Sequence, residues 1–463
     1  MNADTRRWTQ ISVYPRKSVT ESVLSKLIFA ALLGLIAIAP IPYGTVEPWW
    51  KATFICAVFA ICIVALIETI KNPIRRIDGA SILLPMLALA LLALLQTISL
   101  GSRSEANLTV WNTISADPYQ TRFFALQILA LTAFLALLYR YASIDRRVRV
   151  LVFTVLAIAV ASAVFGILRQ TTQQQTGFLL PLLKQNQGFA QFINKNHFAY
   201  LMEMAFGLGV GIVVGGGVAR ERMMIYVALL LPVWTGLVLA NSRGGIIAML
   251  AQILVAVMLL VSGFSSDYEL PQIARSAALR TLLLVILVVG ILFGALWVGG
   301  DRLASNFEAA TSEITISNTR EGASRNEIWR ATLKMFAAHP IAGVGLGGYW
   351  IGITAYHDAS GLMTPQEAHN DYLELLSSAG LIGLALGVWF VVAVVRKTRE
   401  NLSIDTGFKR AVRLGAVLGL TGVAAHSLVD FGLHITANAI VFVVLIMFAT
   451  SRIDNPQRGL IES

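Results

Sequence analysis

Long apolar stretches alternate with short polar segments along the whole chain. Each stretch has about 20 residues, the length that an α-helix needs to cross the hydrocarbon core of a bilayer. The pattern predicts twelve membrane-spanning helices, at 24–42, 49–69, 79–98, 121–139, 149–168, 198–217, 223–240, 245–262, 281–299, 376–395, 412–432 and 437–451. We therefore expect an all-α, polytopic integral membrane protein with one large loop over 300–375.

Composition and charge agree with this prediction. Of the 463 residues, 56% are hydrophobic and 13% are charged, which excludes a soluble globular protein. If the N-terminus is cytoplasmic, every inner segment carries Lys or Arg, and about two thirds of the basic residues lie there. Both termini are then cytoplasmic, and the loop 300–375 faces outward. The same distribution explains the net charge of +10 without a nucleic-acid partner.

Cofactor and metal signatures are weak or missing. Cys56 and Cys62 both lie in the second apolar stretch on different helix faces, so we expect neither a disulfide nor a metal site. The motif GVGLGG (343–348) matches G-x-G-x-x-G, but it follows a predicted helix and has no βαβ unit around it. We expect no dinucleotide, no ATP, no metal and no other cofactor.

The segment SRNEIWRATLKMFAAHP (324–340) predicts a helix that begins at Arg325. Ser324 and Glu327 form a capping box, and Pro340 ends the helix. Arg325 then lies in the first turn, where the helix dipole disfavours a cation. Free N–H groups and a guanidinium together form a good phosphate site. The alternative is a surface arginine whose side chain extends into water.

Arg243 stands alone in NSRGG, between two predicted spans at their outer junction. An ionisable side chain at this depth indicates function, and Gly244 and Gly245 would allow close backbone approach. The alternative is an arginine that reaches up to the lipid headgroups.

The segment TPQEAHNDYLELLSSAGLIGL (364–384) changes from polar to apolar. Thr364 and Glu367 form a second capping box with Pro365 at the first helical position, which predicts a helix over about 365–395. His369 would lie near its N-terminus, where neutral imidazole is favoured and can act as a base. A capping role for His369 is the alternative. Glu374 is either a proton partner or a buried hydrogen-bonded group.

Weaker candidates surround these three residues. His426 and Asp430 are four residues apart, which predicts a shared helix face and either a structural pair or part of a sugar cavity. His197 begins a span, where capping or packing competes with catalysis. The full set of supporting or glycan-binding candidates is Glu374, Asn370, Tyr372, Arg320, His197, His426 and Asp430.

Several segments together resemble the O-antigen ligase and polysaccharide polymerase (Wzy-like) superfamily of bacterial inner-membrane proteins. They are NSRGG, SRNEIWRATLKMFAAHPIAGVGLGGY and EAHNDYLELLSSAGLIGL, with FINKNHFAYLMEM and HSLVDFGLHITANA as flanking matches. The resemblance covers parts of 190–440. It implies a GT-C-like glycosyltransferase in three regions: an N-terminal bundle of about five spans with an outer loop (1–190), a ligase- or polymerase-like core (191–440), and the last span end with a cytoplasmic tail (441–463).

The resemblance also implies a reaction. An undecaprenyl-diphosphate-linked oligosaccharide is the donor, the site faces the periplasm, and the metal-independent transfer inverts the anomeric centre. Carried over by position, Arg243 and Arg325 would bind the diphosphate and His369 would be the base. The acceptor would be glycan in a polymerase or lipid A-core in a ligase. Polymerase is favoured because PYGTVEPWW (42–50) and the flanking segments look more like exopolysaccharide members. Chain-length regulators and export proteins are expected partners.

Two other classes compete with an enzyme. A transporter or flippase of lipid-linked glycan would show paired half-repeats and a midplane site, whereas the candidate polar residues gather at one membrane face. A non-catalytic assembly partner would tolerate His369→Ala.

Overall fold

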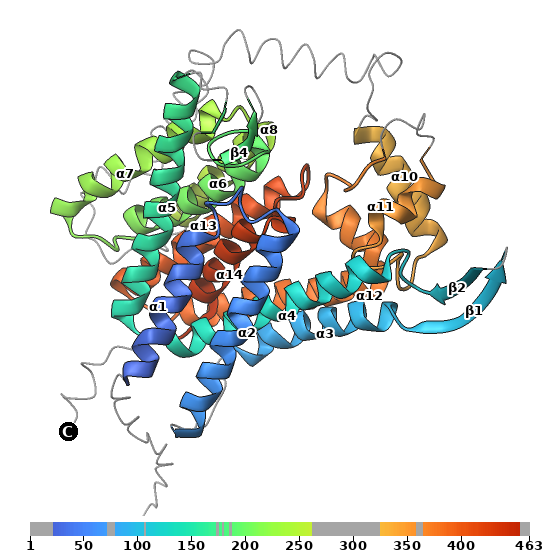
Figure 1. Cartoon of the computed structure of the whole chain (residues 1–463). Coiled ribbons are helices and arrows are strands. Elements are labelled where there is room, and N and C mark those ends of the chain that lie inside the picture. Colours follow the sequence, from blue (N-terminus) through green and yellow to red (C-terminus); the bar gives the residue numbers. More distant parts are fainter. Residues whose placement is uncertain are drawn as a thin grey trace, which may run out of the picture.

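The computed structural model describes residues 22–71, 79–105, 108–172, 176–177, 180–184, 188–261, 325–357 and 364–453, and most of these are helical (Figure 1). The α-helices are α1 (Val23–Ile38), α2 (Pro48–Lys71), α3 (Ala80–Gln96), α4 (Pro118–Tyr141), α5 (Asp145–Thr171), α6 (Lys195–Val214), α7 (Arg220–Leu239), α8 (Arg243–Val261), α10 (Arg325–Ala338), α11 (Tyr349–Gly352), α12 (Asp371–Leu402), α13 (Gly407–His426) and α14 (Thr436–Thr450). Short 3-10 turns are η2 (Ile353–Ala355) and η3 (Gly432–His434). Two antiparallel hairpins are present, β1 (Ser99–Glu105) with β2 (Leu108–Thr113) and β3 (Thr176–Gly177) with β4 (Leu180–Lys184).

Helices occur where the apolar pattern predicts them. Each predicted span that falls on described residues coincides with a helix, and the stretch 281–299 lies outside the described residues. Among the described helices, six are long and apolar enough to cross a membrane: α2, α4, α5, α6, α12 and the part Glu221–Leu239 of α7. Four apolar helices are shorter, namely α1, α3, α14 and the part Arg243–Leu259 of α8. The chain is therefore a multi-pass, helical membrane protein.

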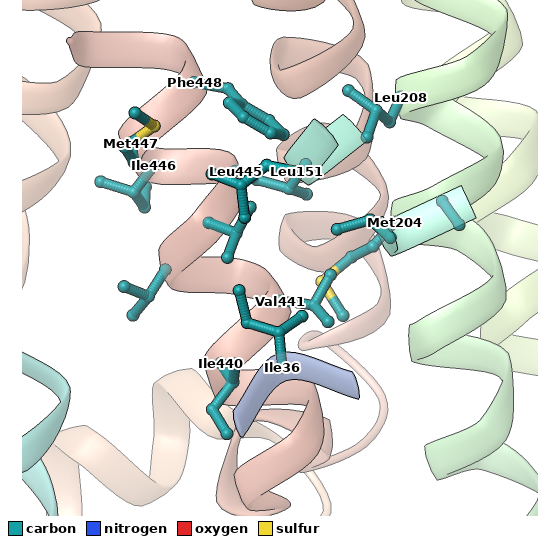
Figure 2. Close-up of a cluster of buried hydrophobic side chains, with 14 of the residues drawn as sticks. Ile36, Leu151, Met204, Leu208, Ile440, Val441, Leu445, Ile446, Met447 and Phe448 are labelled. Atoms are coloured by element: carbon teal, nitrogen blue, oxygen red, sulfur yellow. The ribbon is translucent and has the colours of Figure 1, made fainter. Parts of the chain in front are cut away.

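Helix α14 forms the centre of the bundle. It is apolar around its whole circumference, and all but one of its 15 residues are buried. Figure 2 shows its side chains, among them Leu445 and Phe448, beside Ile36 of α1, Leu151 of α5 and Met204 of α6. Because α14 packs against α1, α5 and α6 at once, it fixes the positions of these helices relative to one another.

Glycines let α6 and α13 approach closely. A Cβ placed on Gly211 would lie 2.1 Å from the Cα of Gly415, and one on Gly207 would lie 2.5 Å from the backbone nitrogen of Gly419. Gly207 and Gly211 are four residues apart on α6, and Gly415 and Gly419 are four residues apart on α13. This spacing of small residues lets the backbones of membrane helices come into contact. The contact matters for the site because α6 and α13 both carry site residues at one end.

The outer faces of the bundle are apolar. Large exposed side chains line α2, α3 and α12, including Ile63 and Ile70, Leu84 and Leu91, and Val388 and Val392. An exposed apolar surface of this extent needs a nonaqueous partner. Lipid is the partner that the length and composition of these helices indicate.

Basic residues gather at the end of the bundle where α14 terminates. Buried Arg413 donates to the carbonyls of Phe448 and Ser451 and pairs with Asp405. Buried Arg147 donates to the carbonyl of Tyr141 at 2.6 Å. Arg413 thus contacts the last turn of α14, about 20 Å along this helix from its first residue. Both arginines belong to the inner basic residues expected from the sequence.

The predicted start of the helix at 365 is wrong. Helix α12 begins at Asp371, and Asn370 caps it by accepting from the backbone N–H groups of Tyr372 and Leu373, both at 3.0 Å. His369 has φ 50°, a left-handed conformation that cannot continue a helix toward the N-terminus. The capping box of Thr364 and Glu367 therefore does not start α12. The described part of helix α10 spans Arg325–Ala338, and the predicted cap Ser324 lies outside the described residues, so the start at Arg325 stays a prediction.

Helix α12 is broken at Gly380, which has φ 62° and ψ −160°. The carbonyls of Ser377 and Ser378 accept from backbone N–H groups of the segment 340–345 at 3.1 and 2.9 Å. The N–H groups of Leu381 and Ile382 donate to carbonyls of the same segment at 2.8 and 3.2 Å. In an unbroken helix these four groups would bond to one another. The segment 340–345, which includes the start of GVGLGG, replaces those bonds.

Gln96, at the end of α3, completes the junction. Its Nε2 donates to the carbonyls of Ala342 at 2.6 Å and Ser378 at 2.9 Å, and its Oε1 accepts from the N–H of Leu346 at 3.0 Å. The side chain is fully buried. The glycine-rich motif thus has a packing role.

Gly380→Ala tests this junction. A Cβ at this position would lie 2.3 Å from the carbonyl oxygen of Ile341, and a left-handed conformation costs a non-glycine residue about 1–2 kcal/mol before any clash. We expect a lower melting temperature for the full-length protein in detergent. Gly34→Ala is the control, because its Cβ would meet nothing within 4 Å. Equal melting temperatures for the two variants would contradict the junction.

Candidate active site

Titratable side chains gather at one end of the bundle, opposite the buried arginines. This end holds the first turns of α6, α8 and α12, the last turn of α13, and the connection 427–435 that contains η3. Four of the six histidines of the chain lie here and interact electrostatically with one another: His197, His369, His426 and His434. Four carboxylates accompany them: Glu203, Asp371, Glu374 and Asp430.

His369 faces a buried carboxylate. Its Nδ1 lies 3.4 Å from Oδ1 of Asp430, and its ring meets the edge of Phe431 with the centroids 4.9 Å apart. The His369 side chain is 33% exposed, whereas that of Asp430 is 1% exposed. One ring nitrogen is thus held by the protein, and Nε2 is left for an incoming group. The left-handed backbone of His369 is locally strained. Strain of this kind is common at functional sites, where it fixes the direction of a side chain.

The carboxyl group of Asp430 has a lowered pKa. The predicted span 412–432 includes Asp430, but helix α13 ends at His426, so Asp430 lies beyond the helix, in the connection to η3. Burial alone would raise the pKa of its carboxyl, but the hydrogen bond from His369 and the positive charges of nearby histidines lower the pKa to about 2. Asn196 also donates to Oδ2, and the N–H of Phe431 donates to Oδ1 at 3.0 Å. Asp430 is therefore ionised at every physiological pH.

Two cations border this pair. Lys195 is the first residue of α6 and Arg243 the first residue of α8; both are exposed, and their charges are close enough to repel each other. Lys195 adjoins Asn196, which bonds to Asp430. Helix N-termini carry partial positive charge, so two of them with two cations form an electropositive corner beside His369.

Arg325 lies in the first described turn of α10. Trp329, one turn later, donates its indole N–H to the carbonyl of Ala368 at 2.9 Å. Residues four apart share a helix face, so the first turn of α10 is held against the backbone that precedes His369. Arg325 is exposed. Arg320 lies outside the described residues.

The expected pairing of His426 with Asp430 is wrong. His426 ends α13, and its Nδ1 lies 2.8 Å from Oε2 of Glu203, with both side chains fully buried. Asp430 bonds to His369 instead, because the chain leaves the helix after His426 and the four-residue spacing no longer defines a face.

The carboxylate of Glu374 is a buried hydrogen-bonded group. Its Oε2 accepts from the N–H of Ala368 at 2.9 Å, which holds the segment before His369 against α12. His434 lies near two carboxylates, with its Nε2 3.5 Å from Glu374 and 3.7 Å from Asp371. Phe431 lies between His369 and His434 and meets both rings.

Three other candidates hold the site together. Asn370 donates its Nδ2 to the carbonyl of Leu428 at 2.8 Å, and Tyr372 donates its hydroxyl to the carbonyl of Ala424 at 2.9 Å. Both contacts fasten α12 to the end of α13. The ring of His197 is buried and meets the edge of Phe431 at 5.1 Å, which agrees with the packing interpretation.

Five residues of the site were not predicted from the sequence: Lys195, Asn196, Glu203, Asp371 and His434. Glu203 carried a signal, since it is the one acidic residue within the stretch 198–217. The others carried none, because a polar residue at a helix start is ordinary capping chemistry.

Comparisons with known proteins identify a similarity over part of the chain. No curated protein matches the chain. A family model described as O-antigen ligase matches residues 226–388. The matched region includes Arg243, Arg325 and His369, and members of this family are glycosyltransferase-like ligases and polymerases. The match over residues 226–388 confirms the resemblance to the O-antigen ligase and polysaccharide polymerase superfamily that the motifs indicate.

Proposed function

We propose that the protein transfers glycan from undecaprenyl diphosphate to an acceptor hydroxyl and so polymerises exopolysaccharide or O-antigen repeat units. The observation that supports this most directly is the His369–Asp430 pair beside the cations Arg243 and Lys195. The pair supplies a base, and the cations supply charge for a leaving diphosphate.

The geometry supports the following reaction. The carboxylate of Asp430 accepts a hydrogen bond from Nδ1–H of His369, which leaves the lone pair of Nε2 to take the proton of the acceptor hydroxyl. The hydroxyl oxygen forms a bond to the anomeric carbon while the bond from that carbon to the diphosphate breaks. Arg243 and Arg325 hold the charge that develops on the diphosphate. A single displacement of this kind inverts the anomeric centre.

The proposed reaction needs no metal ion. Guanidinium groups and helix N-termini stabilise the negative charge of the diphosphate in place of a metal ion.

We further propose a twelve-span arrangement in the bacterial inner membrane, with both termini cytoplasmic and the site toward the periplasm. Support comes from the opposed ends of α14: one meets the buried arginines of the predicted inner set, and the other meets the histidine cluster. Basic residues favour the cytoplasmic side.

The segment 42–50 supports polymerase. Tyr43, Gly44 and Thr45 all have positive φ, and the carbonyl of Gly44 accepts from the N–H of Ala437 at the start of α14. Lys51 follows this segment and interacts electrostatically with Glu367, two residues before His369. The stretch that resembles exopolysaccharide members therefore lies beside the site. Ligase remains the second candidate, because the matching family model is described as O-antigen ligase.

His369→Ala tests the function. In a deletion strain complemented with this variant, we expect glycan transfer to fall about 10²- to 10⁴-fold, because the base is lost. Total cell glycans are resolved by size and by attachment, and the amount of protein in the membrane is checked. His339→Ala is the control, since His339 lies at the end of α10 and bonds to Tyr356.

The glycan pattern separates the candidates. Single repeats that accumulate on the carrier identify a polymerase. Long chains that stay on the carrier and are missing from lipid A-core identify a ligase. Normal glycan in the His369→Ala strain would show that His369 is structural and that the proposed chemistry is wrong.

Asp430→Asn tests the support of His369. We expect activity to fall at least about tenfold, because the amide no longer stabilises the imidazolium formed in the reaction. The carboxyl of Asp430, with a pKa of about 2, is ionised above that pH. The deficit should therefore persist throughout the range of about pH 5 to pH 9. Initial rates across this range measure it, and a deficit that disappears at either end would contradict the assignment.

Arg325→Lys tests the diphosphate contact. An ammonium cannot replace the two parallel bonds of a guanidinium, and a hydrogen bond to a charged group contributes about 1.5–3 kcal/mol. We expect the KM for the lipid-linked donor to rise roughly tenfold or more. Arg330→Lys, an exposed substitution on the same helix, is the control. Equal donor KM values for the two variants would remove Arg325 from the diphosphate site.

A further inference from the structure

The buried pair of Glu203 and His426 has no part in the proposed chemistry. Both side chains are fully buried, with Nδ1 of His426 2.8 Å from Oε2 of Glu203. Oε1 of Glu203 and Nε2 of His426 have no hydrogen-bond partner among the described residues. Burying ionisable groups inside a helix bundle is unfavourable, so a pair that is kept there is expected to have a role.

One side of His426 supports the start of α8. A Cβ on Gly244 would lie 2.2 Å from both Cδ2 and Nε2 of the imidazole. The backbone of Gly244 therefore rests directly on the ring, and only glycine fits there. Arg243 is the residue before this contact and the first of α8. The position of the His426 imidazole therefore determines where the side chain of Arg243 extends from the bundle.

The other side of His426 connects to the start of α12. Tyr200 stacks on the imidazole with the ring centroids 4.0 Å apart and an interplanar angle of 15°. The hydroxyl of Tyr200 lies 3.3 Å from Oγ of Ser427, which donates to Oδ2 of Asp371 at 2.6 Å. The N–H of Asp371 donates to the carbonyl of Ser427 at 3.0 Å. Asp371 is two residues from His369.

We infer that His426, held by Glu203, is a positioning residue that sets the diphosphate-binding Arg243 and the base His369 at a fixed separation. The inference rests on the proposed function, because it assigns a purpose to the pair only if both residues act on one substrate. The backbone of Glu203 is also bound to α8, since its carbonyl oxygen accepts a hydrogen bond from Nε2 of Gln252 at 2.7 Å. The pair therefore connects α6, α8, α12 and α13 at the site.

The contact with Gly244 provides the main test. Gly244→Ala should displace the first turn of α8 and raise the donor KM at least about tenfold, since small misplacements of a binding group have effects of this size. The assay uses purified full-length protein, undecaprenyl-diphosphate-linked oligosaccharide and release of undecaprenyl diphosphate. A purely structural role would reduce the amount of active enzyme, lowering kcat with an unchanged KM.

A double variant tests whether the effect passes through His426. The shorter side chain of His426→Asn makes room for the added methyl group, so Gly244→Ala/His426→Asn should recover part of the donor KM lost in Gly244→Ala. Coupling of this kind is expected only for residues in contact. Gly245→Ala is the control, because its Cβ would face Ala199 and Leu237 rather than the imidazole. His426→Asn should not improve it.

Glu203 variants keep the inference testable if Gly244→Ala fails to fold. Glu203→Gln retains an oxygen that can accept from Nδ1 of His426, so its donor KM should stay near wild type. Glu203→Leu releases the ring, and its donor KM should rise. Equal KM values for these two variants, or additive losses in the double variant, would overturn the inference.

Arg243→Ala separates this inference from the proposed function. If wild-type protein releases no undecaprenyl diphosphate from the donor, the proposed function fails. If Arg243→Ala leaves the donor KM unchanged, the diphosphate role of Arg243 and this inference fail, while the proposed transfer stands. If Arg243→Ala raises the donor KM and Gly244→Ala does not, Arg243 binds donor but His426 does not position it.

Discussion

Backbone hydrogen bonding inside the bundle is the constraint on which the rest of this structure depends. A helix interrupted at membrane depth leaves carbonyl and N–H groups that lipid cannot satisfy. Helix α12 is interrupted at Gly380, and the segment 340–345 and the side chain of Gln96 supply the partners. The break therefore joins α3, α12 and the end of the α10 region in one polar junction. Because α12 begins beside His369, that junction also fixes the height of the site.

The site is assembled from helix ends. The first turns of α6, α8 and α12 and the last turn of α13 meet at one end of the bundle, and this placement concentrates N–H groups and cations where an anion can be held. Below them, the Glu203–His426 pair and the glycine contacts between α6 and α13 allow little adjustment. A rigid support under the half-buried His369 and the exposed cations suits the transfer reaction that we propose.

The helices were predictable because lipid imposes a strong length and polarity rule on a spanning segment. Arg243, Arg325 and His369 were predictable as candidates because each is a polar residue close to apolar sequence. Their partners were not. The spacing of His426 and Asp430 suggested a pair, but the helix ends at His426 and separates them. The capping box at Thr364 and Glu367 suggested an earlier start for α12, but Asn370 and the left-handed His369 place it at Asp371.

The sequence by itself determined the membrane class, the helical stretches and the family resemblance. These properties follow from composition and local pattern, which each segment carries independently of the others. Only the tertiary structure decided that Asp430 rather than Glu374 supports His369, that Glu203 lies against His426, and that Gly244 rests on that ring. Such contacts join residues far apart in the chain. They depend on how whole helices pack, and a single sequence records no signal of that distance.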